Sequence, residues 1–544
     1  MTITNSQTIQ KQWRGPIDSL KSGRDAYRDA ISRIDKPVFA VAHQGDVFVT
    51  HTGTMSWGLP GEETGDGIEL LGFAPPLEPH QLGDRSFKDE LGLHYAYIVG
   101  AMANGITSVE MVEAAGKAGM IGFFGAGGLS IRQIDVAIDR LTAASGKAPF
   151  PYGFNLIHSP NDMQLEMDTA ALYLQRGIRL ISASAYLGLT LPLVYYRFKG
   201  IHRSEDGRIV CPNRVIAKVS RVEVAEKFFA PAPQKLLSEL VQHDLLSESE
   251  ALLAEQVPVA QDITAEADSG GHTDNRPALS LFPTILALRD DAMRRYAFNT
   301  PLRVGLAGGI ATPHSAAAAF SMGAAYILTG SINQAAVEAD TSASVREMLV
   351  QSRQADVTMA PAADMFELGA RVQVLKRGTM FAMRAAKLYE LYRTYCRYED
   401  IPVEIRTMIE RDILRESYEA AWQKTRLYFE TRDPGQITRA QEDAKHRMAL
   451  VFRSYLGQAS LWAKKGLEDR KIDYQIWCGP SMGAFNAWVQ GSFLEAADQR
   501  KTVEMAIQLL TGTVKLMRFQ WLAAQGVAFP STVLDIKPSA RETV

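Results

Sequence analysis

Short apolar runs alternate with amphipathic segments through the middle of the chain, from His94 to about Ser331. Near-continuous apolar strands that alternate with helices predict a parallel sheet covered by helices. Eight strand–helix units in about 240 residues match one (β/α)8 barrel, so the sequence predicts an α/β fold of the TIM-barrel type. The eight runs are HYAYIVG, MIGFFG, PFPYGFNLI, IRLISAS, NRVIAKVS, PVAQDITAEA, LRVGLAGG and AAYILTGS.

The regions on either side of this barrel follow other patterns. PVFAVAHQGDVFVTHTG alternates apolar and polar residues around a Gln-Gly-Asp turn, which predicts a β-hairpin. The Pro- and Gly-rich stretch 58–79 is typical of a linker or an extended arm. After Ser331 the spacing of apolar residues predicts helix almost throughout, including MFELGARVQVL. We therefore expect an N-terminal β-rich segment and linker over 1–90, the barrel over 91–375, and a helical extension over 376–544.

The alternation of strands and helices breaks between the fifth and sixth runs. Residues 221–256 carry two amphipathic helical patterns and a Pro-Ala-Pro turn. Insertions at the carboxyl end of a barrel strand lie over the barrel mouth. We therefore expect an inserted helical subdomain here, which could act as a lid or substrate subdomain.

Composition narrows the classes of function. A formal net charge of −3 gives no electrostatic case for binding nucleic acid or an anionic membrane. The three cysteines lie far apart without CxxC spacing, so neither a disulfide scaffold nor a metal site is expected. No apolar run approaches the roughly 18 residues of a membrane span, and the N-terminal stretch lacks the apolar core of a signal peptide. These features indicate a cytoplasmic location.

Glycine-rich loops follow the last two apolar runs. Gly308 and Gly309 come directly before a helix start, and Gly330 and Ser331 follow the next run in the same way. Each loop alone could be only a tight turn. Together, at the last two strands of a barrel, they favour a phosphate pocket, because exposed backbone N–H groups at helix starts bind anions.

Two earlier loops suggest contact with a flat ring. Gly100-Ala101-Met102 follows the first run, where main-chain amides could meet an isoalloxazine edge and Met102 could pack on the ring. The cluster 125–128 resembles a dinucleotide fingerprint only loosely, because no acidic residue follows at the ribose position; a loop approaching a flat ring explains it equally well. Asn155 ends the third run, and a buried amide needs partners that a pyrimidine-like ring edge would supply.

His272 is the strongest candidate for catalysis. It follows Ser269-Gly270-Gly271 at the end of the sixth run, and these small residues leave no bulky neighbour to bury it. A lone histidine is more often structural, but at this end of a strand it can donate a proton beside a flavin. Asp268 and Asp274 are near enough in sequence to tune its pKa, or could only cap the turn.

A small basic site, Lys376-Arg377-Gly378-Thr379, precedes a long predicted helix. It could anchor a phosphate of NADPH or of a phosphopantetheine arm, or it could be a solvated helix start.

The run from Tyr97 to Leu129, AEADSGGH, LAGGIATPHSAAAAF and MGAAYILTGSINQ together resemble the nitronate monooxygenase / 2-nitropropane dioxygenase superfamily of FMN barrels. Within it, ADSGGHTDNRP, TGSINQAAVEA, APAADMFELGARVQVLKRGTMFAMRAAKLYELY and the helical tail look like the PfaD-type enoyl reductases of polyunsaturated fatty acid and trans-acyltransferase polyketide synthases. The likeness runs from about residue 35 to 525. Asp268-Ser269-Gly270-Gly271-His272 replaces the Glu-x-Gly-Gly-His common in the monooxygenases, and Gly100-Ala101-Met102 replaces their Ala-Pro-Met. Both departures count against nitronate chemistry more than against enoyl reduction.

The resemblance implies a trans-acting enoyl reductase that passes hydride from NADPH through FMN to the β-carbon of a carrier-bound trans-2-enoyl thioester. It implies His272 as active-site acid/base, acyl carrier protein domains as partners, and a homodimer. A nitronate monooxygenase and a non-catalytic assembly subunit of a megasynthase remain as alternatives. The expected FMN contacts are Gly100, Ala101, Met102, Asn155, Lys218, Gly270, Gly271, Gly308, Gly309, Gly330 and Ser331, and the expected phosphate or carrier contacts are Lys376 and Arg377.

Overall fold

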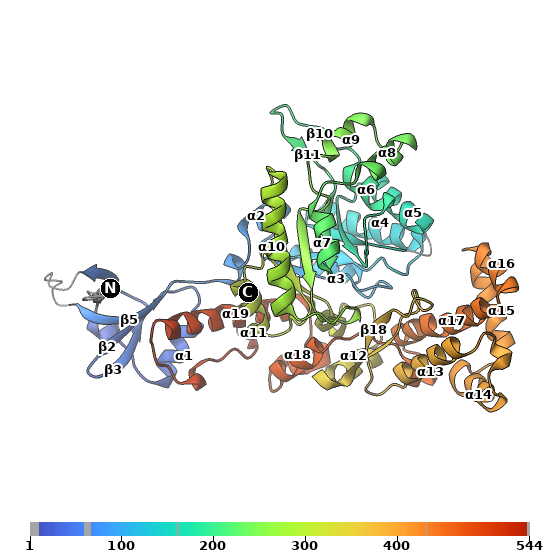
Figure 1. The fold of residues 1–544 in the computed structure, drawn as a ribbon. Helices are drawn as coiled ribbons and strands as arrows, with labels where there is room; N and C mark the ends of the chain where they lie inside the picture. The colour runs from blue at the N-terminus through green and yellow to red at the C-terminus, as the bar shows by residue number, and fades with distance from the viewer. Residues whose placement is uncertain (1–9, 59–66, 160–162, 431, 541–544) are drawn as a thin grey trace, which may run out of the picture.

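The computed structural model describes residues 10–58, 67–159, 163–430 and 432–540. A β-sheet lies at one end of an elongated molecule, a barrel stands in the middle, and a group of helices extends to the other end (Figure 1). Within the described residues, no helix has the length and hydropathy needed to cross a lipid bilayer.

Eight parallel strands close into a barrel, which confirms the predicted fold. They coincide with the eight apolar runs, and the sheet order β12-β13-β15-β16-β6-β7-β8-β9 follows the chain around the barrel. Nearly every strand residue is buried, because helices cover the outside and side chains fill the inside. The strands are β6 (Tyr97–Val99), β7 (Ile121–Phe124), β8 (Tyr152–Ile157), β9 (Leu180–Ser184), β12 (Arg214–Val219), β13 (Asp262–Glu266), β15 (Arg303–Ala307) and β16 (Ile327–Thr329).

The barrel helices begin where the sequence supplies caps. Ser108, Ser130 and Thr312 each accept a hydrogen bond from the backbone N–H three residues further on, which satisfies a donor that a helix start leaves unpaired. Seven helices follow the first seven barrel strands: α3 (Val109–Lys117), α4 (Ile131–Lys147), α5 (Met163–Gln175), α6 (Leu191–Phe198), α7 (Val222–Phe229), α10 (Ala278–Tyr296) and α11 (Pro313–Ser321).

The eighth barrel helix comes from the far end of the chain. Helix α19 (Thr502–Ala524) packs between α11 and α3, which are the helices after the seventh and first strands. Its apolar side chains, Leu509 and Val514 among them, belong to the barrel core. Everything between β16 and α19 is therefore an insertion at the carboxyl end of the eighth strand, so the expected extension 376–544 is not one appended body.

A five-stranded sheet in the order β3-β2-β5-β1-β4 forms the N-terminal part. The predicted hairpin is confirmed, with Gln44 and Gly45 at positive φ in its turn. The linker prediction for 58–79 is wrong over β5, which pairs with both β2 and β1; residues 59–66 lie outside the described residues. The sequence does not predict β5 because the apolar run IELLGFA is short and is flanked by Gly, Pro and Glu residues, which are typical of a linker. The elements are β1 (Gln10–Arg14), α1 (Arg24–Ser32), β2 (Val38–His43), β3 (Asp46–Thr50), β4 (Thr54–Gly58), β5 (Ile68–Ala74) and, before the barrel, α2 (Arg85–Leu91).

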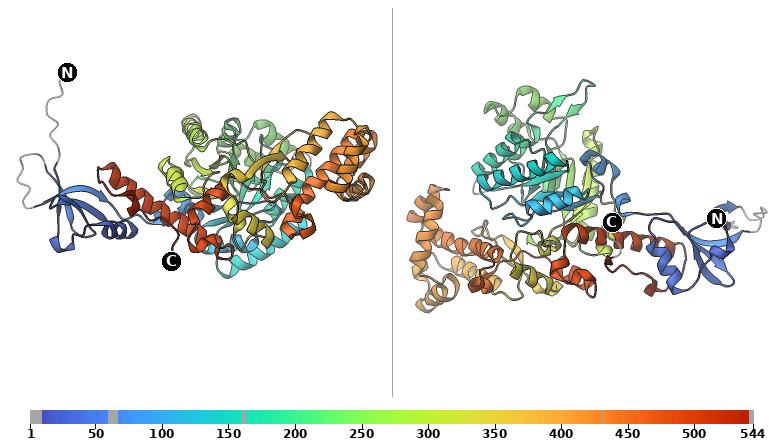
Figure 2. Two further views of the ribbon diagram at one scale, coloured as in Figure 1. Left: turned by 90° about the horizontal axis from the view of Figure 1, so that it is seen from below. Right: turned by 180° about the vertical axis from the view of Figure 1, so that it is seen from behind.

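Helix α19 also joins the barrel to this sheet. Figure 2 shows α19, in red, running from the barrel towards the N-terminal strands. Leu522 of α19 and Val527 share a hydrophobic cluster with Val38 and Ala40 of β2 and Ala74 of β5. The N-terminal sheet and the end of α19 thus pack against each other.

The insertion after β16 contains a small sheet that the sequence analysis missed. Strands β17 (Val357–Pro361) and β18 (Arg371–Leu375) pair antiparallel with each other, and β14 (Gly271–His272) of the barrel pairs with β18. The helical prediction through MFELGARVQVL is wrong. MFELGA forms a turn, and at RVQVL the alternation of apolar and polar residues after Gly369 gives a strand. The insertion's helices are α12 (Ala343–Val350), α13 (Phe381–Thr394), α14 (Val403–Met408), α15 (Tyr418–Glu430), α16 (Pro434–Glu442), α17 (Ala444–Lys465) and α18 (Ser481–Val489).

The helices between the fifth and sixth barrel strands lie away from this insertion. Helices α8 (Gln234–Gln242) and α9 (Glu248–Ala254) pack against α6, and the short hairpin β10 (His202–Arg203) and β11 (Ile209–Val210) lies beside them (Figure 1). They follow α7 rather than a strand, so they lie at the amino-terminal end of the barrel strands. The expectation that they form a lid is therefore wrong.

Replacing Gly512 by Ala tests whether α19 is a true wall of the barrel. A Cβ at Gly512 would lie 2.5 Å from Pro313 Cγ of α11, so we expect a loss of about 1–3 kcal/mol and a lower Tm. The matched control is Gly146→Ala in α4, where a Cβ meets nothing within 4 Å. That change should raise stability by about 0.5–1 kcal/mol, because Ala is the better helix former. Equal melting curves for the two variants would contradict the role of α19.

Candidate active site

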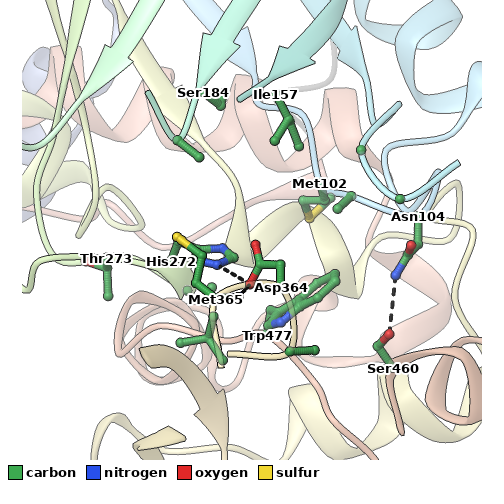
Figure 3. Close-up of a pocket in the computed structure, with 18 of the residues that line it drawn as sticks. Met102, Asn104, Ile157, Ser184, His272, Thr273, Asp364, Met365, Ser460 and Trp477 are labelled. Carbon is green, nitrogen blue, oxygen red and sulfur yellow. Dashed lines mark hydrogen bonds and ion pairs between the residues drawn. The ribbon is translucent and has the colours of Figure 1, made fainter. Parts of the chain in front are cut away.

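A cavity of about 1160 Å³ lies at the carboxyl ends of the barrel strands and extends along the helices of the insertion (Figure 3). The loops after the barrel strands form one side, and α15, α17 and the segment between β17 and β18 form the other. The structure brings His272 and every expected cofactor contact to its surface: Gly100, Ala101, Met102, Asn155, Lys218, Gly270, Gly271, Gly308, Gly309, Gly330 and Ser331.

The loops after the seventh and eighth strands have the geometry of an anion cradle. Gly308 and Gly309 have φ values of 82° and 75°, which glycine adopts without strain. A Cβ on Gly308 would lie 2.5 Å from the Ala267 carbonyl, whereas Gly309 and Gly330 face open space. Their backbone N–H groups can therefore approach a phosphate without side chains in the way.

The loops after the first and second strands pack back to back. A Cβ on Gly125 would lie 1.7 Å from the Met102 carbonyl oxygen, so only glycine fits there. The buried Thr107 hydroxyl accepts from the Met102 N–H at 2.8 Å and donates to the Gly100 carbonyl at 2.8 Å. Thr107 thus holds the rim of the cavity, and sequence reasoning missed it because a threonine after a turn carries no functional signature.

Asn155 and Lys218 enter the cavity with one partner each. Asn155 Oδ1 accepts the Ala126 N–H at 2.6 Å, which leaves its amide nitrogen as the group that can bind a ligand. Lys218 Nζ lies 2.5 Å from Glu266 Oε1, and both side chains are largely buried. Glu266 also accepts from Ser269 Oγ at 3.1 Å. The ion pair therefore fixes Lys218 beside the His272 loop.

His272 is held by a partner that lies far away in the sequence. Its Nε2 is 3.0 Å from Asp364 Oδ1, on the segment between β17 and β18 (Figure 3). Its backbone pairs with Val372 of β18, and the preceding Gly271 pairs with Gln373. The insertion therefore positions both the main chain and the imidazole of His272.

The two acidic residues that flank His272 in the sequence have other roles. Asp268 accepts from Asn275 Nδ2 at 2.7 Å and from Gln373 Nε2 at 2.9 Å. Asp274 forms an ion pair with Arg221 at 3.0 Å. They brace the loop, and the expectation that they tune the pKa of His272 is wrong.

Asp364 determines the charge of His272. Burial lowers the pKa of the imidazole, but the hydrogen bond and the negative charge of Asp364 raise it by more, so the net pKa of His272 lies above its ordinary value of 6.5. Burial alone would raise the pKa of Asp364, and the same hydrogen bond lowers it overall. The pair favours an imidazolium facing a carboxylate, which can hold a proton at the cavity surface.

The segment between α17 and α18 closes the cavity beside the His272 loop. A Cβ on Gly270 would lie 2.9 Å from the Gly479 nitrogen, so neither position has room for a side chain. The Gly479 N–H donates to Ser331 Oγ at 3.1 Å, which ties this segment to the glycine loop after the eighth strand. Trp477 lines the cavity and pairs with Val374 through its backbone.

Lys376 and Arg377 are not brought to the cavity. They follow β18 at the end opposite Arg371, and Arg377 lies 3.6 Å from Asp356. Besides the predicted Lys218, five further basic residues line the cavity and went unpredicted, because none belongs to a local motif: Arg221, Arg371, Lys424, Arg432 and Arg453.

Part of the chain matches a known family model, and most of it is similar to known proteins in sequence and in structure. Residues 395–474 match the family model described as [acyl-carrier-protein] S-malonyltransferase, inserted helical domain. The chain is 44% identical over 454 residues to a polyunsaturated fatty acid synthase subunit of Thraustochytrium sp., covering 82% of this chain and 30% of that protein. It is 44% identical over 441 residues to the polyketide biosynthesis protein PksE of Bacillus subtilis, covering 81% of this chain and 57% of that protein. The chain therefore spans only part of the length of each of these relatives.

The crystal structure of the enoyl reductase domain of MlnA, from the macrolactin biosynthesis cluster of Bacillus amyloliquefaciens, superposes with a TM-score of 0.78 at 39% identity. The match covers 82% of this chain and 99% of that domain. Fold and site define an α/β barrel with a ligand cavity closed by an insertion after the eighth strand. The chain belongs to the PfaD-type enoyl reductase family.

Asp364→Asn should lower the pKa of His272 below its ordinary value, because burial remains while the charge that opposes it is lost. Titration of 13C-labelled imidazole by NMR measures this directly. The control is Asp274→Asn, in the same loop but paired with Arg221, and it should leave the pKa of His272 unchanged.

The same pair makes stability depend on pH. Because the folded-state pKa of His272 is raised, its contribution is complete below about pH 6.5 and is lost as the pH rises through the raised value. Because the pKa of Asp364 is lowered, its contribution is present above about pH 3.8 and is lost as the pH falls through the lowered value. In Asp364→Asn, the dependence due to the Asp364 carboxylate should vanish. The dependence due to His272 should reverse, so that the melting temperature falls as the pH falls below about 6.5, because the pKa of His272 is then lowered. An unchanged profile would contradict this coupling.

Proposed function

We propose that the protein is a trans-acting enoyl reductase that uses NADPH and FMN to reduce the 2,3 double bond of trans-2-enoyl thioesters bound to acyl carrier protein domains, in polyunsaturated fatty acid or polyketide biosynthesis. The observation that carries the proposal is the single cavity that joins His272 and its Asp364 partner to the glycine loops after the seventh and eighth strands. The likeness to the MlnA enoyl reductase domain supports the same reaction.

The residues at the cavity fit a flavin mononucleotide. Gly309 and Gly330 leave open a cradle that a side chain would fill, and their N–H groups would bind the phosphate. The loop Gly100–Met102 and the amide nitrogen of Asn155 would hold the edge of the ring. Lys218 would place a positive charge beside it. When bound, FMN accepts hydride from NADPH and donates it to the substrate.

The chain's own residues supply the proton and the environment. Reduction adds a hydride at the β-carbon and a proton at the α-carbon while NADPH becomes NADP⁺. His272, kept protonated by Asp364, holds the proton for the α-carbon. The insertion covers the mouth from α15 to Trp477 and places the His272 loop inside the cavity.

The purified protein should show the absorption bands of oxidised flavin. Without oxygen, NADPH should bleach them and crotonyl thioester should restore them, as followed by stopped-flow spectroscopy. Rapid bleaching by propyl nitronate in place of NADPH would favour the monooxygenase, and a colourless protein that FMN cannot reconstitute would contradict both.

Replacing His272 by Ala should lower the rate of thioester reduction by about 10²–10⁴-fold, because a positioned proton donor contributes that much. The flavin spectrum and its reduction by NADPH should persist, since the imidazole donates to the substrate and not to the cofactor. Full activity in this variant would favour the non-catalytic assembly subunit. Asp274→Asn in the same loop serves as the control for folding.

A further inference from the structure

The outer part of the cavity is built by two helices of the segment that matches the inserted helical domain, residues 395–474. We propose that α15 and the turn after it bind the phosphate of a carrier-bound phosphopantetheine arm, with Arg432 and Lys424 as the phosphate-binding residues. This docking site rests on the proposed function and specifies where the carrier domain presents its substrate.

Helix α17 forms a continuous wall from the catalytic pair outward. Arg453 Nε donates to the Ala363 carbonyl at 2.9 Å, directly beside Asp364. Its cavity-facing positions recur at helical spacing and are mostly small or polar, so they leave room for an extended chain: Leu450, Arg453, Ser454, Gly457, Gln458 and Leu461. Helix α17 is also attached to the barrel rim, because Asn104 Nδ2, in the loop after the first barrel strand, donates to Ser460 Oγ at 3.3 Å (Figure 3).

Helix α15 and the turn after it form the second wall of the cavity, and this wall carries two positive charges, Lys424 and Arg432. Lys424 and Tyr428 are four residues apart in α15, so they lie along one face, and Arg432 follows in the turn after the helix. Tyr428 is 51% exposed, and the guanidinium of Arg432 lies 4.4 Å from its ring centroid and donates to its hydroxyl. The tyrosine thus holds Arg432 over the opening of the cavity instead of letting it extend into solvent.

The charges at this opening favour an anion. Among the described residues, no carboxylate lies within ion-pairing distance of Arg432. Lys424 forms an ion pair with Glu416 at 2.5 Å but remains 67% exposed. Asp433 is the acidic residue on this face, and its carboxylate caps α16 by accepting from the Gly435 N–H at 3.2 Å and Gln436 Nε2 at 2.8 Å. A guanidinium without a carboxylate partner is suited to a phosphodiester, and the exposed ammonium group of Lys424, further along the same cavity wall, adds positive charge.

The chemistry of a carrier-bound substrate matches this arrangement. Its thioester must reach His272, while the phosphodiester at the other end of the pantetheine arm stays near the carrier domain. A cavity with a proton donor inside and cations at its opening accommodates both ends of one extended ligand. The cations at the opening therefore recognise the arm, whatever acyl group it carries.

Two substrates that differ only in the phosphate test the site: crotonyl-4′-phosphopantetheine and crotonyl-pantetheine. In the wild type, kcat/KM should be higher for the phosphorylated substrate. In Lys424→Ala/Arg432→Ala this ratio should fall by about fivefold or more, because charge-assisted hydrogen bonds to the phosphate are lost. Arg432→Lys, which keeps a charge, should restore part of the ratio. The matched control is Arg411→Ala, an exposed arginine of the same segment away from the cavity, which should keep the wild-type ratio.

A ratio of one in the wild type, an unchanged ratio in the double variant, or an equal fall in Arg411→Ala would overturn the proposal. A crotonyl thioester on a recombinant acyl carrier domain should show a matching fall in kcat/KM in the double variant. If kcat/KM of the double variant falls for crotonyl-4′-phosphopantetheine but not for the carrier-bound thioester, the site binds a free coenzyme. That result would overturn the carrier assignment.

Binding measured by calorimetry, with 4′-phosphopantetheine against pantetheine, separates this proposal from the proposed function. Preferential binding of the phosphorylated arm by a wild type that reduces no enoyl thioester would overturn the reductase function and leave the docking site in place. If the wild type reduces enoyl thioesters but binds both arms equally, the docking site is overturned and the reductase function stands.

Discussion

The two-residue pairing of β14 with β18 is the contact on which the site depends. It joins the loop after the sixth barrel strand to an insertion that leaves the barrel after the eighth strand. Backbone hydrogen bonds fix the main chain of His272, and the adjoining segment supplies Asp364 to fix and charge its side chain. Without this pairing, the histidine would stand on a glycine loop with no defined direction, since glycine removes the steric limits on φ.

The topology makes this contact rigid. The insertion begins at β16 and ends at α19, and both belong to the barrel, so the inserted body is anchored at two points. The Gly270–Gly479 approach and the Gly479–Ser331 hydrogen bond add further points around the same cavity. A site assembled from such distant segments can be precise, because each segment is supported by packing outside the site.

The sequence predicted the barrel well, because each strand is a short apolar run and the period of the helices between them is clear. It also predicted which barrel residues face the cavity, since the carboxyl ends of parallel strands meet at one edge. It could not predict Asp364, whose relation to His272 depends on strand pairing across a separation of 92 residues. The sequence could not show that α19 packs against the barrel. An amphipathic pattern indicates which face of a helix is buried, but not which part of the protein buries it. The basic residues of the outer cavity carry no local motif, whereas the basic pair that does form one, Lys376 and Arg377, lies outside the cavity.

The return of α19 has a consequence for how the protein is made. A ribosome releases the whole insertion before it releases the last helix of the barrel, so the nascent barrel waits with its eighth flank open while the later segments fold. The open flank exposes the apolar surface that α19 will cover, including the face of α11 around Pro313. The insertion is therefore made before the helix that completes the outer layer of the barrel, and it can fold while that flank is still open.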